Sequence, residues 1–136
     1  MSIDLQALAA AHEGTLAATL GVRFVSAEKE RVVCELAMAP AFATVGGGVH
    51  GGVLMAFADI AGAVGAFLNL PPGTRTSTME SKTNMVGSIR DGVLRAEAVP
   101  VHIGARTMVW QTRVTDAASG RLLALTTQTQ MTLPIG

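Results

Sequence analysis

The stretch GGGVHGGVLMAFADIAGAVGAF, residues 46–67, carries a single charged side chain, Asp59. Five glycines flank His50, which lies nine residues before this carboxylate. Burying an ionised carboxylate is costly unless a partner compensates for it or a reaction uses it. The stretch therefore predicts either a membrane span interrupted by a charge or a buried helix whose carboxylate has a function.

The sequence around this stretch favours the buried helix. Residues 51–70 have the ~20-residue length that a membrane span requires. However, no cluster of Lys or Arg flanks them to set the orientation of a span in the membrane. Asp59 would lie near the bilayer centre, at a cost of roughly 2.5–3.5 kcal/mol. The chain after residue 74 has the pattern of amphipathic strands, which need a core to cover. We therefore expect no membrane span.

The composition of the chain bounds its class. The 136 residues are 49% hydrophobic and 15% charged, which is typical of one globular domain. Ten basic and ten acidic side chains cancel, so no basic surface suggests nucleic acid. Cys34 is the only cysteine, and His12 and His102 lack ligand partners at useful spacing, so we expect no metal site. The N-terminus lacks the pattern of a signal peptide, which predicts a cytoplasmic protein.

The remaining segments alternate as strands should. Residues 31–38 place Val32, Cys34 and Leu36 on one face, and PPG at 71–73 is expected to end the long helix. We predict one α+β domain over residues 1–136, with a helical segment at 1–19 and a core at 20–134. The core is an antiparallel sheet wrapped around the long helix. The predicted strands are 22–27, 31–38, 76–84, 92–102, 106–115 and 121–133.

The long helix also predicts self-association. A helix that is apolar on all sides must be enclosed, and one six-stranded sheet covers only part of it. The uncovered part of the helix and the free sheet edges therefore predict a homodimer.

Three segments together resemble a known family. HGGVLMAFADIAGAVGA, residues 50–66, is similar to the signature of hotdog-fold acyl-CoA thioesterases of the PaaI-like group, related to phenylacetic acid degradation. That signature is HGG, six residues, then Asp or Glu. Residues 77–98 and 101–134 resemble the family's next strand segment and its closing hairpin, so the likeness spans roughly residues 20–134. It implies a hotdog fold, acyl-CoA thioesterase activity, a dimer of dimers, and Asp59 as the catalytic carboxylate.

The residues themselves suit thioester hydrolysis. This reaction needs hydrogen-bond donors aimed at the developing oxyanion and a base or nucleophile beside the carbonyl carbon. Gly51 and Gly52 open the helix, so their N–H groups lie at the positive end of the helix dipole with no side chain in the way. Asp59 supplies the carboxylate, either as a base that activates water or as a nucleophile. The sequence leaves both roles open.

The spacing of these residues predicts a site shared between two chains. Gly52 and Asp59 are seven residues apart on one face, which is roughly 10 Å along a helix at ~1.5 Å per residue. One carbonyl carbon can hardly be reached by both groups of the same chain. Two antiparallel helices would instead place Asp59 of one copy opposite the Gly51 amide of the other, and the resemblance implies the same composite site.

Other polar residues complete the candidate site. We expect His50 to hold the glycine loop rather than to act as a base. The resemblance implies that Ser77 orients the attacking water and that Thr44 stands where relatives often have Asn or Gln, with a shorter reach to the substrate carbonyl. For the phosphates of coenzyme A, the candidates are Arg106, which we favour, Lys82 and Arg90; solvated surface charge is the alternative for each.

Two functions from different classes remain at this stage. The first is an acyl-CoA thioesterase acting on an aryl or medium-chain acyl group, with coenzyme A entering only as part of the substrate and no separate cofactor. The second is a non-catalytic protein that binds acyl-CoA or an acyl carrier. Such a protein would not need the Asp59 carboxylate, which favours the enzyme.

Overall fold

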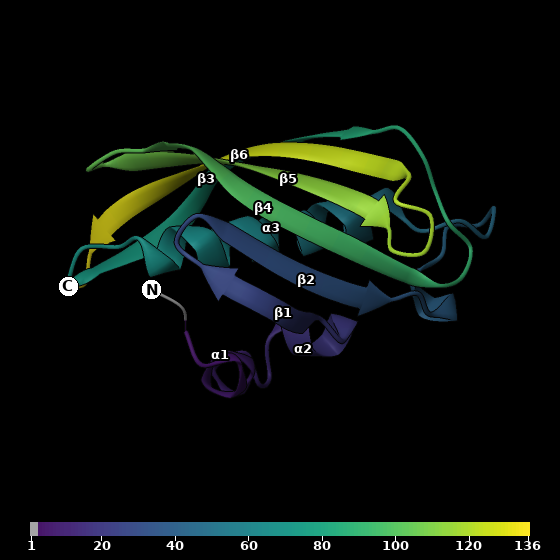
Figure 1. The fold of residues 1–136 in the computed structure, drawn as a ribbon, viewed down its shortest axis with the longest axis horizontal. Helices are drawn as coiled ribbons and strands as arrows, with labels where there is room; N and C mark the ends of the chain where they lie inside the picture. The colour runs from purple at the N-terminus through teal and green to yellow at the C-terminus, as the bar shows by residue number, and fades with distance from the viewer. Residues whose placement is uncertain (1–2) are drawn as a thin grey trace.

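A computed structural model describes residues 3–136 (Figure 1). One six-stranded antiparallel sheet has the strand order β1-β2-β4-β5-β6-β3. The sheet curves over a single long helix, α3, and the two short helices α1 and α2 lie beside β1 (Figure 1). The elements are α1 (Leu5–Ala11), α2 (Leu16–Leu20), β1 (Arg23–Glu28), β2 (Arg31–Ala37), η1 (Pro40–Phe42), α3 (Gly51–Leu68), β3 (Thr74–Met85), β4 (Val93–Ile103), β5 (Thr107–Asp116) and β6 (Leu122–Pro134).

The core lies between α3 and the concave face of the sheet. Leu54 and Phe57 of α3 are buried against the inward-facing residues of the strands, such as Trp110. Burying a side chain of this size stabilises a fold by roughly 1.5–3 kcal/mol. Gly65 lets α3 approach the sheet closely, because a Cβ at this position would clash with the Trp110 ring. The α+β architecture predicted from the sequence is confirmed.

α3 is the core helix of this domain. Its length and its mean hydropathy of 1.8 would also allow it to cross a membrane. In the structure it packs along the sheet, where it contacts all six strands. A buried core helix meets the same criteria of length and composition as a membrane span.

The strands begin and end within two residues of their predicted positions, but the helical segment 1–19 is wrong as one continuous helix. In the described part of the chain, α1 ends at Ala11 and α2 starts at Leu16. Gly14 between them has φ +74°, a conformation outside the right-handed helix that glycine adopts easily. The Thr15 hydroxyl donates to the His12 carbonyl oxygen at 2.6 Å, a local bond that competes with helix continuation. α3 ends at Leu68, three residues before the first proline of PPG. Asn69 is its C-cap residue, and the Asn69 side chain donates to the Gly65 carbonyl oxygen at 2.9 Å.

β3 is a long edge strand. Its twelve residues pair with β6 on one side only. A long unpaired edge offers free N–H and C=O groups to another strand. The uncovered edge therefore lies beside the part of the fold that carries Asp59, because Thr78 of β3 contacts that carboxylate.

Candidate active site

The start of α3 leaves one amide free. His50 is the N-cap residue, and its Nδ1 accepts a hydrogen bond from the Gly52 N–H at 2.8 Å. Val53 and Leu54 donate to the His50 carbonyl oxygen. Among residues 3–136, the Gly51 N–H has no acceptor. Of the two glycine amides predicted as donors, Gly52 is engaged by His50 and only Gly51 is available for a ligand.

The loop before α3 is held by short backbone bonds. The Thr44 N–H donates to the Gly48 carbonyl oxygen at 2.7 Å, and the His50 N–H donates to the Phe42 carbonyl oxygen at 2.8 Å. Thr44 is exposed, and within the described residues its hydroxyl makes no hydrogen bond. The structure thus places Thr44 in the turn of the glycine loop and does not bring it to Asp59.

Asp59 is anchored through one oxygen. Its Oδ1 accepts hydrogen bonds from the Thr78 hydroxyl at 2.7 Å and from Gln128 Nε2 at 2.9 Å. Its Oδ2 has no partner among residues 3–136, and the residue is half-buried where α3 meets β3 and β6. The carboxylate is therefore fixed in orientation and presents one oxygen outward.

A chain of hydrogen bonds leads to this carboxylate. The Thr76 hydroxyl donates to Gln130 Oε1 at 2.9 Å, and Gln130 Nε2 donates to the Thr78 hydroxyl at 2.7 Å. Thr78 in turn donates to Asp59, so every donor in the chain points toward the carboxylate. Chains with one direction polarise their members and strengthen the last bond.

Sequence reasoning missed these partners. Gln128 and Gln130 are fully buried on β6, and they alternate with residues of the outer face. The pattern TTQTQ in a strand places polar side chains on the inward face. Because buried polar groups are hydrogen-bonded, this pattern predicts a buried hydrogen-bond network. That signal is present in the sequence at residues 126–130.

Ser77 lies on the other face of β3. It is exposed and pairs with Met131, whereas its neighbours Thr76 and Thr78 point toward α3. Side chains alternate along a strand, so Ser77 cannot share their direction. The structure brings Thr78, not Ser77, to Asp59.

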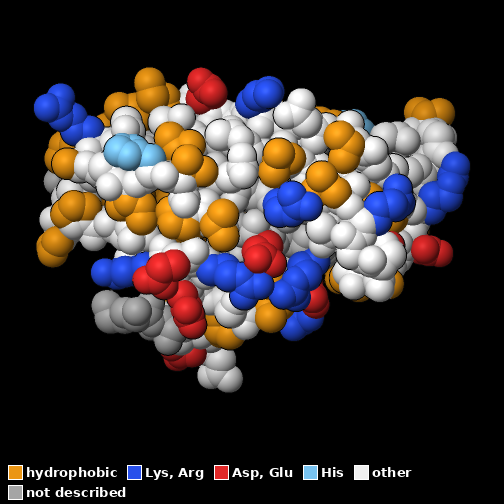
Figure 2. Space-filling view, turned by 45° about the horizontal axis from the view of Figure 1, so that its top comes forward, with side chains coloured by type: hydrophobic (Ala, Val, Ile, Leu, Met, Phe, Trp, Pro, Cys, Tyr) orange, Lys and Arg blue, Asp and Glu red, His pale blue; other side chains and the backbone are white. Residues whose placement is uncertain are grey.

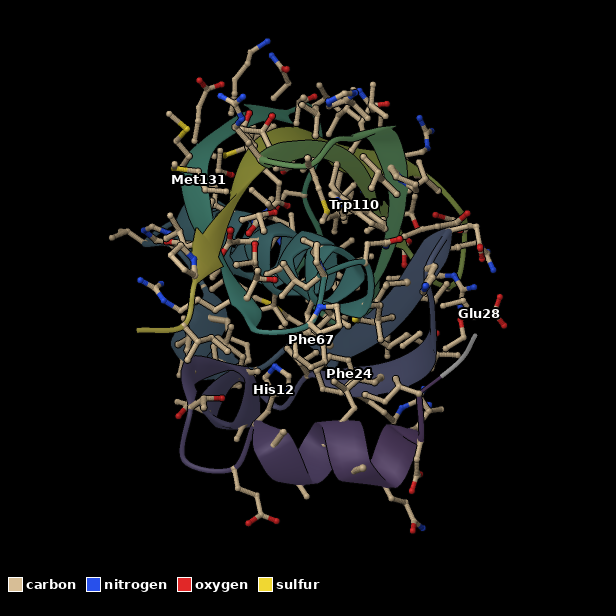
Figure 3. The ribbon with its side chains drawn as sticks, turned by 90° about the vertical axis from the view of Figure 1, so that its left-hand side faces the viewer. His12, Phe24, Glu28, Phe67, Trp110 and Met131 are labelled. Carbon is tan, nitrogen blue, oxygen red and sulfur yellow. The ribbon has the colours of Figure 1, made fainter. Side chains whose placement is uncertain are left out.

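An apolar cleft opens beside Asp59. Its volume is about 290 Å³, and it lies between α1 and the open side of α3. Figure 3 shows His12 and Phe67 from its two walls close together, with Phe24 next to His12. Besides Asp59, the cleft is lined by Leu8, Ala11, His12, Ile60, Ala63, Val64 and Phe67.

The three predicted phosphate-binding cations do not gather at one place. The Arg90 guanidinium packs against Gly47, in the loop that leads to Gly51. Arg106 lies in the turn between β4 and β5, and Lys82 is exposed on β3. Arg121 was not among the predicted cations. Its guanidinium lies beside the segment that leads to Arg90, where Nη2 donates to the Ser88 carbonyl oxygen at 2.6 Å. No group of three or more His, Cys, Asp or Glu that could hold a metal ion occurs in residues 3–136.

The antiparallel sheet wrapped around one long helix is a hotdog fold, and the comparisons with known proteins assign its class. The family model of the thioesterase superfamily matches residues 46–122. The chain belongs to this superfamily, and it is a thioester hydrolase.

The similar proteins agree in fold and reaction class. The chain is 33% identical over 98 residues to a 1,4-dihydroxy-2-naphthoyl-CoA hydrolase of Listeria monocytogenes, covering 72% of this chain and 80% of that one. It is 30% identical over 120 residues to the hydrolase of the same name from Escherichia coli, covering 88% of each. A mutant thioesterase from Pseudomonas aeruginosa shares the fold with a TM-score of 0.93 at 23% identity, covering 99% of this chain and 97% of that one.

Proposed function

We propose that this hydrolase cleaves the thioester of an aryl or medium-chain acyl-CoA to the free acid and coenzyme A, with Asp59 as base or nucleophile. The observation that carries the proposal is the geometry of Asp59. Two donors hold its Oδ1, and its Oδ2 is free beside an apolar cleft of about 290 Å³. The relatives named as 1,4-dihydroxy-2-naphthoyl-CoA hydrolases support an aryl group over an aliphatic one.

Two routes use the free oxygen. As a base, Oδ2 takes a proton from water while the hydroxide adds to the carbonyl carbon; the C–S bond then breaks and the thiolate of coenzyme A takes up the proton. As a nucleophile, Oδ2 attacks the carbonyl carbon itself, thiolate leaves, and water hydrolyses the resulting anhydride. In both routes an N–H must stabilise the oxyanion, and the free Gly51 N–H fits this role.

Asp59 and that amide belong to different copies in this proposal. Gly51 and Asp59 of one helix are eight residues apart, about 12 Å along the axis at ~1.5 Å per residue. α3 also carries exposed Met55 outside the cleft, a side chain that a second α3 would cover. Pairing of two β3 edges would place the two α3 helices antiparallel, as the composite site predicted from the sequence requires.

Apolar side chains also lie on the outer face of the sheet. Figure 2 shows them among charged groups on the face that comes forward when the top of Figure 1 is tilted to the viewer. Val99, Val101 and Ile103 of β4 are exposed hydrophobic residues. A second dimer could cover these side chains in the dimer of dimers that the resemblance implies. The dimer of dimers, the PaaI-like assignment and the cytoplasmic location all stay predictions.

The corner formed by Arg90 and Arg121 is the best place for the phosphates of coenzyme A. The Arg90 guanidinium lies at Gly47, in the glycine loop that leads to the Gly51 amide, and the Arg121 guanidinium lies at Gly87 and Ser88. A thioester carbonyl held by Gly51 would extend its pantetheine arm from the same loop. We therefore favour this corner over Arg106 and Lys82, and coenzyme A enters as part of the substrate with no separate cofactor.

A panel of acyl-CoAs tests this function. Benzoyl-, phenylacetyl-, hydroxynaphthoyl-, hexanoyl- and palmitoyl-CoA are incubated with the protein, and released thiol is measured with a chromogenic disulfide. We expect turnover of aryl-CoAs and a loss of about 10²–10⁴ in kcat for Asp59→Asn, the usual worth of a positioned acid or base. Hydrolysis by Asp59→Asn at the parent rate would refute the role of the carboxylate. No release from any substrate would refute acyl-CoA as the substrate class.

A further inference from the structure

The far wall of the cleft carries one polar ring, that of His12. His12 follows the last residue of α1 and is half-buried, and the remaining lining of the cleft is apolar apart from Asp59. Its ring lies against Phe24, with ring centroids 4.9 Å apart and an interplanar angle of 44° (Figure 3). The contact with Phe24 fixes the plane of the imidazole.

Hydrogen bonding fixes the tautomer of this ring. His12 Nδ1 lies 2.8 Å from the Leu8 carbonyl oxygen. A carbonyl oxygen only accepts, so Nδ1 carries the proton and donates it. In the neutral ring Nε2 is then an acceptor, and it has no hydrogen-bond partner within the described residues. His12 lines the same cleft as Asp59, so its unpaired Nε2 is a candidate acceptor for a ligand held there.

The size and lining of the cleft fit an aromatic ring. Ligand pockets usually start at ~300 Å³, and an engineered cavity of ~150 Å³ holds one benzene molecule. A cleft of about 290 Å³ therefore suits one or two rings better than a long chain. Phe67 and Ile60 offer flat and branched apolar surface to such a ring.

We infer that the cleft binds the acyl group as a hydroxylated aromatic ring, whose hydroxyl donates a hydrogen bond to His12 Nε2. His12 is then a specificity residue, and α1 forms the wall that reads the acyl group. This inference rests on the proposed function, because Asp59 at the near end of the cleft must face the thioester. The acceptor on His12 selects a donor, so a methoxy or fluoro group at the same ring position cannot replace the hydroxyl.

The test compares the kcat/KM values of differently substituted benzoyl-CoAs, separately for the wild type and for each variant. kcat/KM is measured for benzoyl-CoA and for the 2-, 3- and 4-hydroxy, -methoxy and -fluoro derivatives. In the wild type we expect at least one hydroxy isomer to exceed its fluoro counterpart by roughly 10-fold, the worth of one net hydrogen bond to a neutral group. In His12→Phe, which keeps a ring against Phe24, this ratio should fall to about 1. His12→Gln, which restores an acceptor, should recover part of it. Glu13→Gln, on the exposed neighbouring residue, should keep the wild-type ratio.

The outcomes separate this inference from the function beneath it. Equal kcat/KM for all hydroxy and fluoro pairs in the wild type overturns the inference, whether or not the variants fold. An unchanged hydroxy preference in His12→Phe overturns the role of His12. Turnover of hexanoyl-CoA without turnover of any benzoyl-CoA overturns the aromatic class but leaves the thioesterase. Absence of hydrolysis with every acyl-CoA overturns the proposed function and the inference together.

Discussion

Asp59 shows how hydrogen bonds hold a carboxylate in an apolar helix. Thr78 and Gln128 both donate to Oδ1. Hydrogen bonds to charged groups contribute roughly 1.5–3 kcal/mol each, which offsets part of the cost of removing the carboxylate from water. Because both bonds fall on the same oxygen, they also fix the direction of Oδ2.

Gln128 is the anchor that can be removed most cleanly. It is fully buried, and its Oε1 has no hydrogen-bond partner in the described structure. Gln128→Leu deletes the donor to Asp59 together with this unsatisfied oxygen, so the melting temperature should hold while the carboxylate loses one restraint. We expect kcat to fall by about 10-fold with little change in KM, the signature of lost positioning.

The matched control lies on the opposite face of the sheet. Gln111 donates to the Thr127 hydroxyl at 3.3 Å and does not approach Asp59. Gln111→Leu should leave both kcat and KM unchanged. A Gln128→Leu protein that melts as the parent and keeps its kcat would show that Thr78 alone positions the carboxylate.

Cys34 should be chemically silent in the folded protein. Burial raises the pKa of this thiol to about 12, and the side chain is inaccessible on the inner face of β2. The thiolate is the reactive form, so at pH 8 a chromogenic disulfide should modify no thiol in native protein and one per chain in urea. Since the folded pKa is raised above the unfolded value, Cys34 also weakens the fold as pH rises above about 9, the range in which the unfolded thiol ionises. Rapid labelling at pH 8 without denaturant would contradict this burial.

At the scale of elements, the start of α3 combines a cap and a candidate oxyanion donor. His50 occupies the Gly52 amide and leaves the Gly51 amide free. Gly51 is the first helical residue, the position where proline is best tolerated. His50 has φ −66° and ψ 136°, a conformation that a following proline accepts.

Gly51→Pro and Gly51→Ala therefore form a pair that isolates one N–H group. Both add a Cβ, which meets the flexible end of the Met85 side chain, but only proline removes the N–H. We expect Gly51→Pro to lose a further 10²–10³ in kcat relative to Gly51→Ala, about the worth of one oxyanion donor. Measured kcat values that match within a factor of two, in variants with equal melting temperatures, would place the oxyanion donor elsewhere.

The elements were easier to predict from the sequence than the site. Alternation of apolar and polar residues identifies each strand by itself, as in Val32, Cys34 and Leu36, because the pattern depends only on neighbours along the chain. The partners of Asp59 lie on β3 and β6, 19 and 69 residues further along. Which of Ser77 and Thr78 faces α3 depends on the register of β3 against β6, and a bulge between Thr78 and Glu80 shifts that register.

Local competition explains the other differences. The engagement of the Gly52 amide depends on the rotamer of a nearby side chain, His50, which spacing does not specify. The split between α1 and α2 depends on one glycine conformation and one hydroxyl contact. The N-terminal segment also gains its place at the cleft only through packing of α1 against β1, which no pattern within residues 3–19 reveals.

At the scale of the whole molecule, the single chain leaves complementary surfaces open. β3 has a free edge, and the neighbouring side of α3 exposes apolar side chains around Asp59. We propose that a second copy covers both surfaces. Each chain would then contribute Asp59 to one site and the Gly51 amide to the other.

A mixed dimer tests this shared site most directly. Asp59→Asn and Gly51→Pro chains are co-expressed with different tags, and the heterodimer is purified through both tags. If the sites are shared, one site carries both substitutions and the other carries neither, so the heterodimer should hydrolyse aryl-CoA at about half the wild-type kcat per dimer. Each homodimer should retain no more than about one part in 10² of that rate. A heterodimer as inactive as its two parents would show that Asp59 and Gly51 act within one chain, and would contradict the shared site.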